Sequence, residues 1–163
     1  FANQFLSQEE QVQTTARNGQ VPRIIQANSQ AALGQALLQQ VTNTAQNQPH
    51  WRIAIIGKSV QECEALYAQL DEEQQHAIQL ITTEDTFMKR RIMIIPAFLA
   101  KGLEFDSVYA WNIGDNFTTS QDQLILYTIA TRGMHELTVL VPNNQSPLLE
   151  PLDATTYQWQ EVE

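Results

Sequence analysis

The sequence predicts an α/β fold, in which a mostly parallel sheet is covered by helices on both faces. Two unbroken apolar runs, at residues 52–56 and 92–95, are typical of buried parallel strands. Segments with helical periodicity separate the expected strands, and this alternation favours a parallel sheet. The 163 residues, of which 43% are hydrophobic and 17% charged, suffice for one folded domain.

The first half of the chain alternates between expected helices and strands. Residues 1–6 have the pattern of a helix end, and residues 17–22 have turn composition. A short strand is expected at 23–25, followed by a helix at 29–43 with apolar Leu33, Leu37 and Val41 four residues apart. The strand at 52–56 leads into a helix that Ser59 caps, with Glu62 in the reciprocal capping-box position. The inward stripe of this helix is expected to be Val60, Cys63, Tyr67 and Leu70.

The second half continues the alternation. A weaker strand is expected at 78–82, and clear ones at 92–95 and 108–111. Ser120 is expected to cap a helix that ends near Arg132, with Gln123 completing a second capping box. A strand at 137–141 follows. After Pro142 the pattern fades, and we expect a C-terminal tail over 142–163, with or without a short strand.

The charge of the chain argues against an autonomous nucleic-acid-binding domain. The formal net charge is −9, whereas binding to nucleic acid is driven by neutralising phosphates. One basic cluster, Lys89 to Arg91, is either a solvated lead-in to the next strand or a contact for a phosphate or a partner. No apolar run approaches the roughly 20 residues of a membrane span, so no membrane contact is expected.

The cysteine and histidine content gives little support to metal or thiol chemistry. Cys63 is the only cysteine, so the chain has neither an internal disulfide nor a cysteine-based zinc site. Its place on an apolar helix face predicts a packed thiol in a reducing, cytoplasmic setting. The histidines at 50, 76 and 135 lack the spacing of metal ligands.

Gly57, Lys58 and Ser59 resemble the end of a phosphate-binding P-loop, because they follow a strand and open a helix. The first glycine of that motif is replaced by Arg52, and the strand runs directly into Gly57 without a loop. We therefore expect a tight strand-to-helix turn rather than a nucleotide site, and no ATP hydrolysis by this chain alone.

The expected topology suggests where a site lies. Ligands of open parallel sheets bind at the carboxyl ends of the strands. The loop after Ile95 and the helix end at Arg132 are therefore expected site positions.

Two short segments carry the functional information. Residues 100–106 read AKGLEFD, and residues 126–132 read LYTIATR. They resemble motifs V and VI of the UvrD/Rep-like superfamily 1 helicases, KGLEFD and YVxxTRA, with Gly133 where the family usually has alanine. Over roughly residues 1–141 the chain resembles the C-terminal RecA-like lobe of that family, often called 2A, a P-loop NTPase-type three-layer αβα domain.

The resemblance implies an ATP site shared with an N-terminal RecA-like lobe of the same protein, which would hold ATP and Mg²⁺. The chain begins with Phe1 rather than Met, and we expect it to be a fragment of a longer DNA helicase or translocase. By this resemblance, Arg132 would reach the γ-phosphate. Arginine suits this role because its guanidinium stays charged and donates several hydrogen bonds. Its other interpretation is a surface arginine at a helix C-terminus.

The first motif is expected to line the nucleotide as well. Gly102 would allow close approach of the backbone, and Lys101 would support the phosphate side or the loop. Glu104 resembles the carboxylate that accepts hydrogen bonds from the ribose, with a structural polar role as the alternative.

The residues before the first motif depart from the family. Where members have Thr-x-His close to single-stranded DNA, this chain has Pro96 and Phe98. Phe98 either stacks on a base or packs into the core. This variant resembles the HelD-type branch, whose members bind RNA polymerase and help to release it from nucleic acid. The working partner is therefore DNA, as a single strand or duplex junction, or RNA polymerase, and a non-catalytic interaction module is a third alternative.

Overall fold

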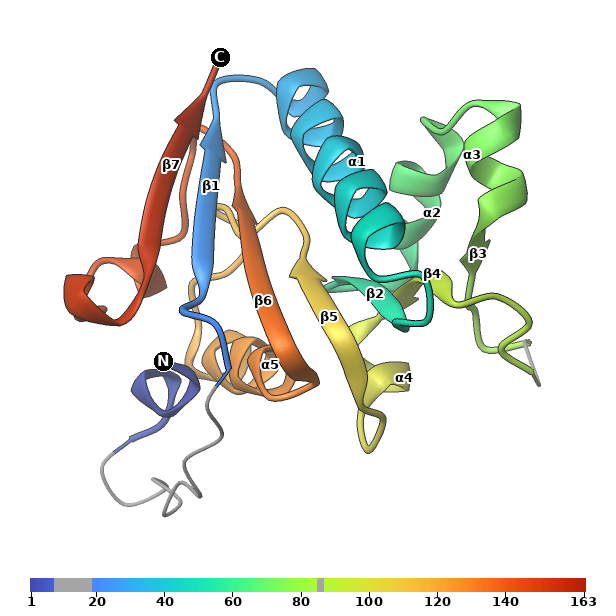
Figure 1. Ribbon diagram of the computed structural model, residues 1–163. Helices are drawn as coiled ribbons and strands as arrows, with labels where there is room; N and C mark the ends of the chain where they lie inside the picture. The colour runs from blue at the N-terminus through green and yellow to red at the C-terminus, as the bar shows by residue number, and fades with distance from the viewer. Residues whose placement is uncertain (8–18, 85–86) are drawn as a thin grey trace.

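A computed structural model describes residues 1–7, 19–84 and 87–163 and contains a seven-stranded sheet with helices on both faces (Figure 1). The strand order is β3-β4-β2-β5-β6-β1-β7, and each neighbouring pair is parallel. The expected parallel α/β architecture is therefore confirmed. The strands are β1 (Arg23–Ala27), β2 (Ile53–Gly57), β3 (Ile78–Leu80), β4 (Ile92–Pro96), β5 (Phe105–Ala110), β6 (Gly133–Val141) and β7 (Gln158–Val162).

The helices divide the core into two parts. Helices α1 (Gln30–Asn47) and α2 (Val60–Ala68) pack on one face, where Leu33, Leu37 and Cys63 are buried. Helices α4 (Ala97–Ala100) and α5 (Ser120–Ala130) pack on the other face, with Ala100 and Ile129 buried. The remaining helices are α3 (Glu72–Ala77) and the 3₁₀ helices η1 (Ala2–Phe5), η2 (Pro147–Leu149) and η3 (Ala154–Thr156). In the part of the chain that the structure describes, no helix is long and apolar enough to cross a membrane.

The central strands owe their position to their composition. Every residue of β2 is buried, as are four of the five residues of β4, because both faces are covered by helices. The buried Tyr109 hydroxyl bonds to the Thr44 hydroxyl at 2.8 Å and donates to the Gln40 carbonyl at 3.2 Å. Burial of this tyrosine is therefore compatible with a fully hydrogen-bonded interior.

Two capping predictions are corrected by the structure. The Ser59 hydroxyl accepts from the Glu62 amide at 3.2 Å, but the Glu62 carboxylate accepts from the Lys58 amide, so the box is not reciprocal. Helix α5 is capped by Thr119 with Asp122, not by Ser120 with Gln123. The Asp122 carboxylate reaches back to the preceding amides, so the helix begins one residue earlier than its serine suggests.

Further differences concern short or weakly patterned segments. In α2, Leu66 is buried, whereas Val60 and Tyr67 of the expected inward stripe are only half-buried. Helices α3 and α4, of six and four residues, are too short for a periodic signal and were not expected. Residues 1–6 contain one 3₁₀ helix. In the segment expected as a tail with or without a short strand, the structure has the short strand β7. Arg17 and Asn18 of the expected turn lie outside the described residues.

Candidate functional site

Arg132 lies at the junction of α5 and β6, and its guanidinium folds back on the end of the helix. Nε donates to the Thr128 carbonyl at 3.1 Å, and one terminal nitrogen donates to the Thr131 hydroxyl at 3.1 Å. The other terminal nitrogen donates to the Leu103 carbonyl at 3.3 Å. The backbone adds a further link, since the Phe105 amide donates to the Arg132 carbonyl at 2.8 Å. The two helicase-like motifs, 29 residues apart along the chain at this contact, are therefore joined directly.

The loop from Lys101 to Glu104 presents polar groups next to Arg132. Gly102 has φ +83°, and a Cβ there would meet no atom within 4 Å, so open space surrounds it. Positive φ is the reason for glycine at this position. The side chains of Lys101 and Glu104 are exposed, and Leu103 is half-buried. The structure therefore brings Lys101, Gly102, Glu104 and Arg132 to one neighbourhood.

This neighbourhood lies at the amino edge of the sheet. Gly133, the first residue of β6, pairs with Phe105, the first residue of β5, so the residues before them share that edge. The expectation that Arg132 lies at the carboxyl ends of the strands is therefore wrong. The reason is topological: α5 runs back across the sheet, so its last turn lies where β6 begins.

Pro96 and Phe98 occupy the opposite, carboxyl edge, as expected for the loop after Ile95. Pro96 is the last residue of β4, pairs with Gly57 and is buried. The Phe98 side chain is 57% exposed in α4, which excludes the alternative that it packs into the core. The sequence-predicted residues thus divide into two groups at opposite edges of the sheet.

Most cations of the chain lie at the amino edge. Seven of the nine lysines and arginines begin a strand or precede one within a few residues: Arg23, Arg52, Lys89, Arg90, Arg91, Lys101 and Arg132. Arg91 donates to the carbonyls of Ala45, Gln48 and Trp51, so it caps the C-terminal end of α1, whereas Lys89 and Arg90 are exposed. The acidic Glu104 and Asp106 lie among these cations. On a protein of net charge −9, this edge nonetheless concentrates the positive charge that attracts phosphates.

Lys58 has a structural role, in agreement with the sequence analysis. Its ammonium forms an ion pair with the Asp122 carboxylate at 2.8 Å, donates to the Asn116 carbonyl and lies 5.0 Å from the centre of the Phe117 ring. These contacts engage the ammonium at the start of α5. Ser59 caps α2, as the tight-turn interpretation requires.

The sequence did not predict Asp122 as a partner of Lys58. Its position three residues after Thr119 indicates a helix start but gives no sign of the ion pair. Burial by itself raises the pKa of this carboxyl. Hydrogen bonds from Lys58 and from the backbone of Thr118 and Thr119 outweigh burial and hold the pKa of Asp122 well below its usual range. Asp122 is therefore ionised at neutral pH and stabilises the Lys58 ammonium.

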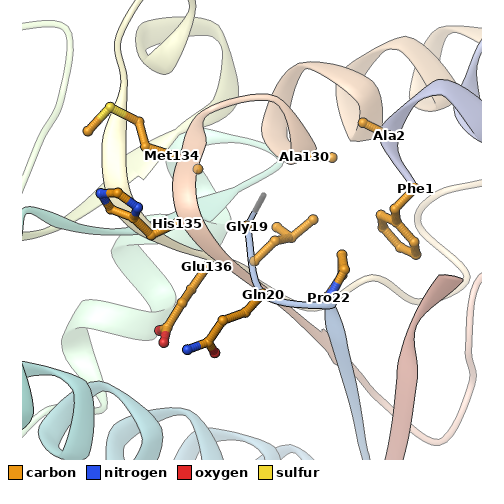
Figure 2. A pocket seen from close by; sticks show the side chains of 11 residues that line it. Phe1, Ala2, Gly19, Gln20, Pro22, Ala130, Met134, His135 and Glu136 are labelled. Atoms are coloured by element: carbon orange, nitrogen blue, oxygen red, sulfur yellow. The ribbon is translucent and has the colours of Figure 1, made fainter. Parts of the chain in front are cut away.

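Cys63 is not placed as a reactive thiol, and the pocket beside η1 is not a nucleotide site. Burial raises the pKa of the Cys63 thiol to about 12, as expected for a packed cysteine. Figure 2 shows a pocket between η1 and the start of β6, lined among others by Phe1, Gln20 and His135. Its volume is about 150 Å³. Sites for drug-sized ligands measure about 300–1,000 Å³, so this pocket is too small for a nucleotide. Within residues 1–7, 19–84 and 87–163, no group of three His, Cys, Asp or Glu side chains is placed to hold a metal ion.

Solved structures of helicase domains are similar to the chain, and two of them are the following. The C-terminal domain of a possible DNA helicase from Lactobacillus plantarum WCFS1 shares 35% sequence identity over 89% of this chain and 88% of that chain, with a TM-score of 0.77. Domain 2 of the DEAD-box helicase Mss116p, solved with an RNA duplex, has a TM-score of 0.57 and 12% identity. That match covers 88% of this chain and 64% of that chain, and it supports the fold alone. No protein-family model and no curated protein matches the chain.

The fold and these matches define the class of protein: the chain is a RecA-like lobe of the helicase type. Within this class, it belongs to the same family as the C-terminal domain of the possible DNA helicase from L. plantarum.

Proposed function

We propose that this lobe is the C-terminal motor lobe of a UvrD/Rep-like superfamily 1 DNA helicase or translocase. In this proposal, Arg132 acts on the γ-phosphate of ATP bound by an N-terminal RecA-like lobe of the same protein. The observation that carries the proposal is the hydrogen bond from Arg132 to the Leu103 carbonyl, which joins the two motifs at the cationic amino edge. In this proposal the nucleotide contacts the amino edge of the sheet, where the positive charge attracts its phosphates.

The contacts of Arg132 suit a residue that exchanges partners. In this structure its guanidinium donates to two neutral carbonyls and one hydroxyl. A phosphate oxygen is a stronger acceptor, since charge-assisted hydrogen bonds are roughly twice as strong as neutral ones. The arrival of a phosphate would therefore draw the guanidinium away from Leu103, without breaking a buried ion pair.

The loop before β5 would contribute the remaining contacts. Gly102 leaves open space for a ligand to approach the backbone, and the exposed Lys101 ammonium would face the phosphates. The exposed Glu104 carboxylate would accept hydrogen bonds from the ribose hydroxyls. Mg²⁺, which neutralises charge on the β- and γ-phosphates, is assigned to the N-terminal lobe, because in P-loop NTPases it is held by the P-loop Ser/Thr and an aspartate of the lobe that binds ATP.

The test is Arg132→Ala in the protein that contains both lobes. We expect nucleic-acid-stimulated ATP hydrolysis to fall by about 10³–10⁵, because a transition-state arginine supplies that factor in measured systems. Glu64→Ala, which removes an exposed charge of α2 outside both motifs and outside the cations of the amino edge, should leave turnover unchanged. Near-normal turnover in the Arg132 variant, with unchanged thermal unfolding, would remove this assignment. Absence of ATP hydrolysis in the unaltered two-lobe protein would instead favour a non-catalytic interaction module.

The second candidate is a HelD-like ATPase that binds RNA polymerase and helps to release it from nucleic acid. It is supported by Pro96 at the carboxyl edge. Pro96 is buried at the end of β4, so it cannot make the polar contact to DNA that the residue at this position makes in other members. Strand separation by the two-lobe protein, compared with its binding to purified RNA polymerase, distinguishes the two. Unwinding without polymerase binding favours the helicase, and the reverse result favours the second candidate.

A further inference from the structure

A β-bulge immediately follows Arg132. Phe105 of β5 pairs with Gly133, but Ser107 pairs with Glu136, so Met134 and His135 together oppose the single residue Asp106. Such an extra residue bends its strand and redirects neighbouring side chains, and bulges are frequent beside active sites. The bulge is therefore a candidate for determining where the Arg132 guanidinium lies.

Gly133 is required by the space inside this bulge. A Cβ on residue 133 would lie 2.7 Å from the Glu136 carbonyl oxygen and 3.5 Å from the Val108 Cβ. The first distance is shorter than any normal contact, and the atom it meets belongs to the backbone, so a side-chain rotation cannot relieve it. A methyl group at position 133 must displace either the bulge or the residues before it.

The bulge itself is held on two sides. The His135 ring stacks on Trp51, with ring centres 5.1 Å apart and planes at 16°, and its Nε2 lies 3.6 Å from the Asp106 carboxylate. The His135 carbonyl accepts from the Gln20 amide at 3.2 Å. Figure 2 shows Gln20 beside this part of β6, next to the small pocket. Beyond the bulge, residues 137–141 of β6 are buried. This part of β6 pairs with β1 on one side and with β5 on the other, so it is held firmly in the sheet.

The segment before Gly133 is less buried than residues 137–141. Thr131 and Arg132 are half-buried, and the backbone there leaves the helix. A displacement caused by a methyl group at 133 therefore passes toward Arg132. Because the guanidinium lies at the end of a long side chain, a small shift of the backbone is enough to change its hydrogen bonds to Thr128 and Leu103.

We infer that Gly133, together with the bulge it permits, is a positioning residue for Arg132. The expected effect of Gly133 on catalysis rests on the proposed function, whereas its expected effect on the position of Arg132 does not. Alanine, the residue expected from the helicase resemblance, would not be accommodated here without moving the arginine.

The first experiment is independent of function. In the 163-residue chain labelled with ¹⁵N-arginine, the Nε–H signal of Arg132, identified by its loss in Arg132→Lys, reports the bond to Thr128. Gly133→Ala should shift this signal and speed its exchange with solvent. Gly34→Ala, whose Cβ would meet its nearest atom at 3.8 Å, should leave it unchanged. An unaltered Arg132 signal in folded Gly133→Ala would overturn the inference.

His135→Ala keeps the test decisive if Gly133→Ala does not fold. It releases the stack on Trp51 without adding a methyl group at 133, so the bulge loosens. The same Arg132 signal should shift in the same direction, though less. No shift in this variant would also contradict the proposed link.

The second experiment measures catalysis by the two-lobe protein. Gly133→Ala should lower kcat for ATP hydrolysis about ten- to a hundredfold, because a misplacement of about 1 Å costs about that factor. Gly114→Ala introduces a comparable clash, 2.7 Å from Pro142 Cγ, at the carboxyl edge and should retain kcat. If Arg132→Ala lowers turnover and Gly133→Ala does not, the inference fails and the proposed function stands. If Arg132→Ala itself retains turnover, the proposed function fails, and the arginine signal still decides the inference.

Discussion

The Lys58–Asp122 ion pair provides a sharp test of the structural role of Lys58. Lys58→Met keeps the length of the apolar stem and removes only the ammonium. The Asp122 side chain is 8% exposed and lies 2.8 Å from the Lys58 ammonium, so it would stay buried and charged without its partner. We expect the variant to fold with lower stability and with unchanged affinity for ATP in the two-lobe protein.

The magnitude follows from burial. Removing one partner of a buried ion pair costs about 3–5 kcal/mol. Two features reduce the cost here: the Lys58 side chain is 28% exposed, and Asp122 keeps hydrogen bonds from the Thr118 and Thr119 amides, both at 2.9 Å. A loss of about 2–3 kcal/mol is therefore expected, which corresponds to a fall in Tm of about 4–12 °C for a domain of this size.

The assay is urea unfolding at several pH values, with the exposed Lys89→Met as the control, for which a change below about 0.5 kcal/mol is expected. The folded-state pKa of Asp122 is lowered, so its ionised form stabilises the fold above the unfolded pKa of about 3.9. This contribution is lost as the pH falls toward the folded pKa. The stability difference between the wild type and Asp122→Asn should accordingly be full at pH 7 and narrow below about pH 4.

Two results would refute this reasoning. One is a Lys58→Met protein as stable as the wild type. The other is weakened ATP binding by this variant, which would restore the phosphate-binding interpretation of Gly57, Lys58 and Ser59.

The other predictions concern the two edges of the sheet. Gly102→Ala should lower the free energy of unfolding by about 1–2 kcal/mol, because φ is +83° and alanine disfavours that conformation although space is available. Urea unfolding measures this change, and an unchanged or higher stability would contradict the prediction. Phe98→Ala should weaken binding of single-stranded DNA to the two-lobe protein by about 1–3 kcal/mol if this exposed ring stacks on a base; fluorescence anisotropy measures this, and unchanged affinity would exclude stacking.

Local signals in the sequence were sufficient for the main elements of the fold. The unbroken apolar run at 52–56 predicted β2, and the four-residue spacing of Leu33, Leu37 and Val41 predicted α1. The short helices α3 and α4 were not predicted because they carry too few residues for a periodic signal. The start of α5 was misplaced by one residue because both Thr119 and Ser120 are good capping residues, and only the reach of the Asp122 carboxylate decides between them.

The site required the tertiary structure at two points. The sequence placed Arg132 correctly at a helix end but at the wrong ends of the strands, since that placement depends on the direction in which α5 crosses the sheet. The partner of Lys58 was also hidden, because Lys58 and Asp122 are brought together only by the pairing of β2 with β5.

The sequence by itself therefore determined the parallel α/β class, most strands and the identity of the residues that resemble helicase motifs, because these depend on local composition and spacing. The tertiary structure decided which of those residues are neighbours. Arg132 meets Leu103 at the cationic amino edge, while Phe98 lies at the opposite edge. It also revealed the bulge that leaves no room for a Cβ at position 133, because that space is set by the Glu136 carbonyl and by the pairing of β6 with β5, which no local pattern records.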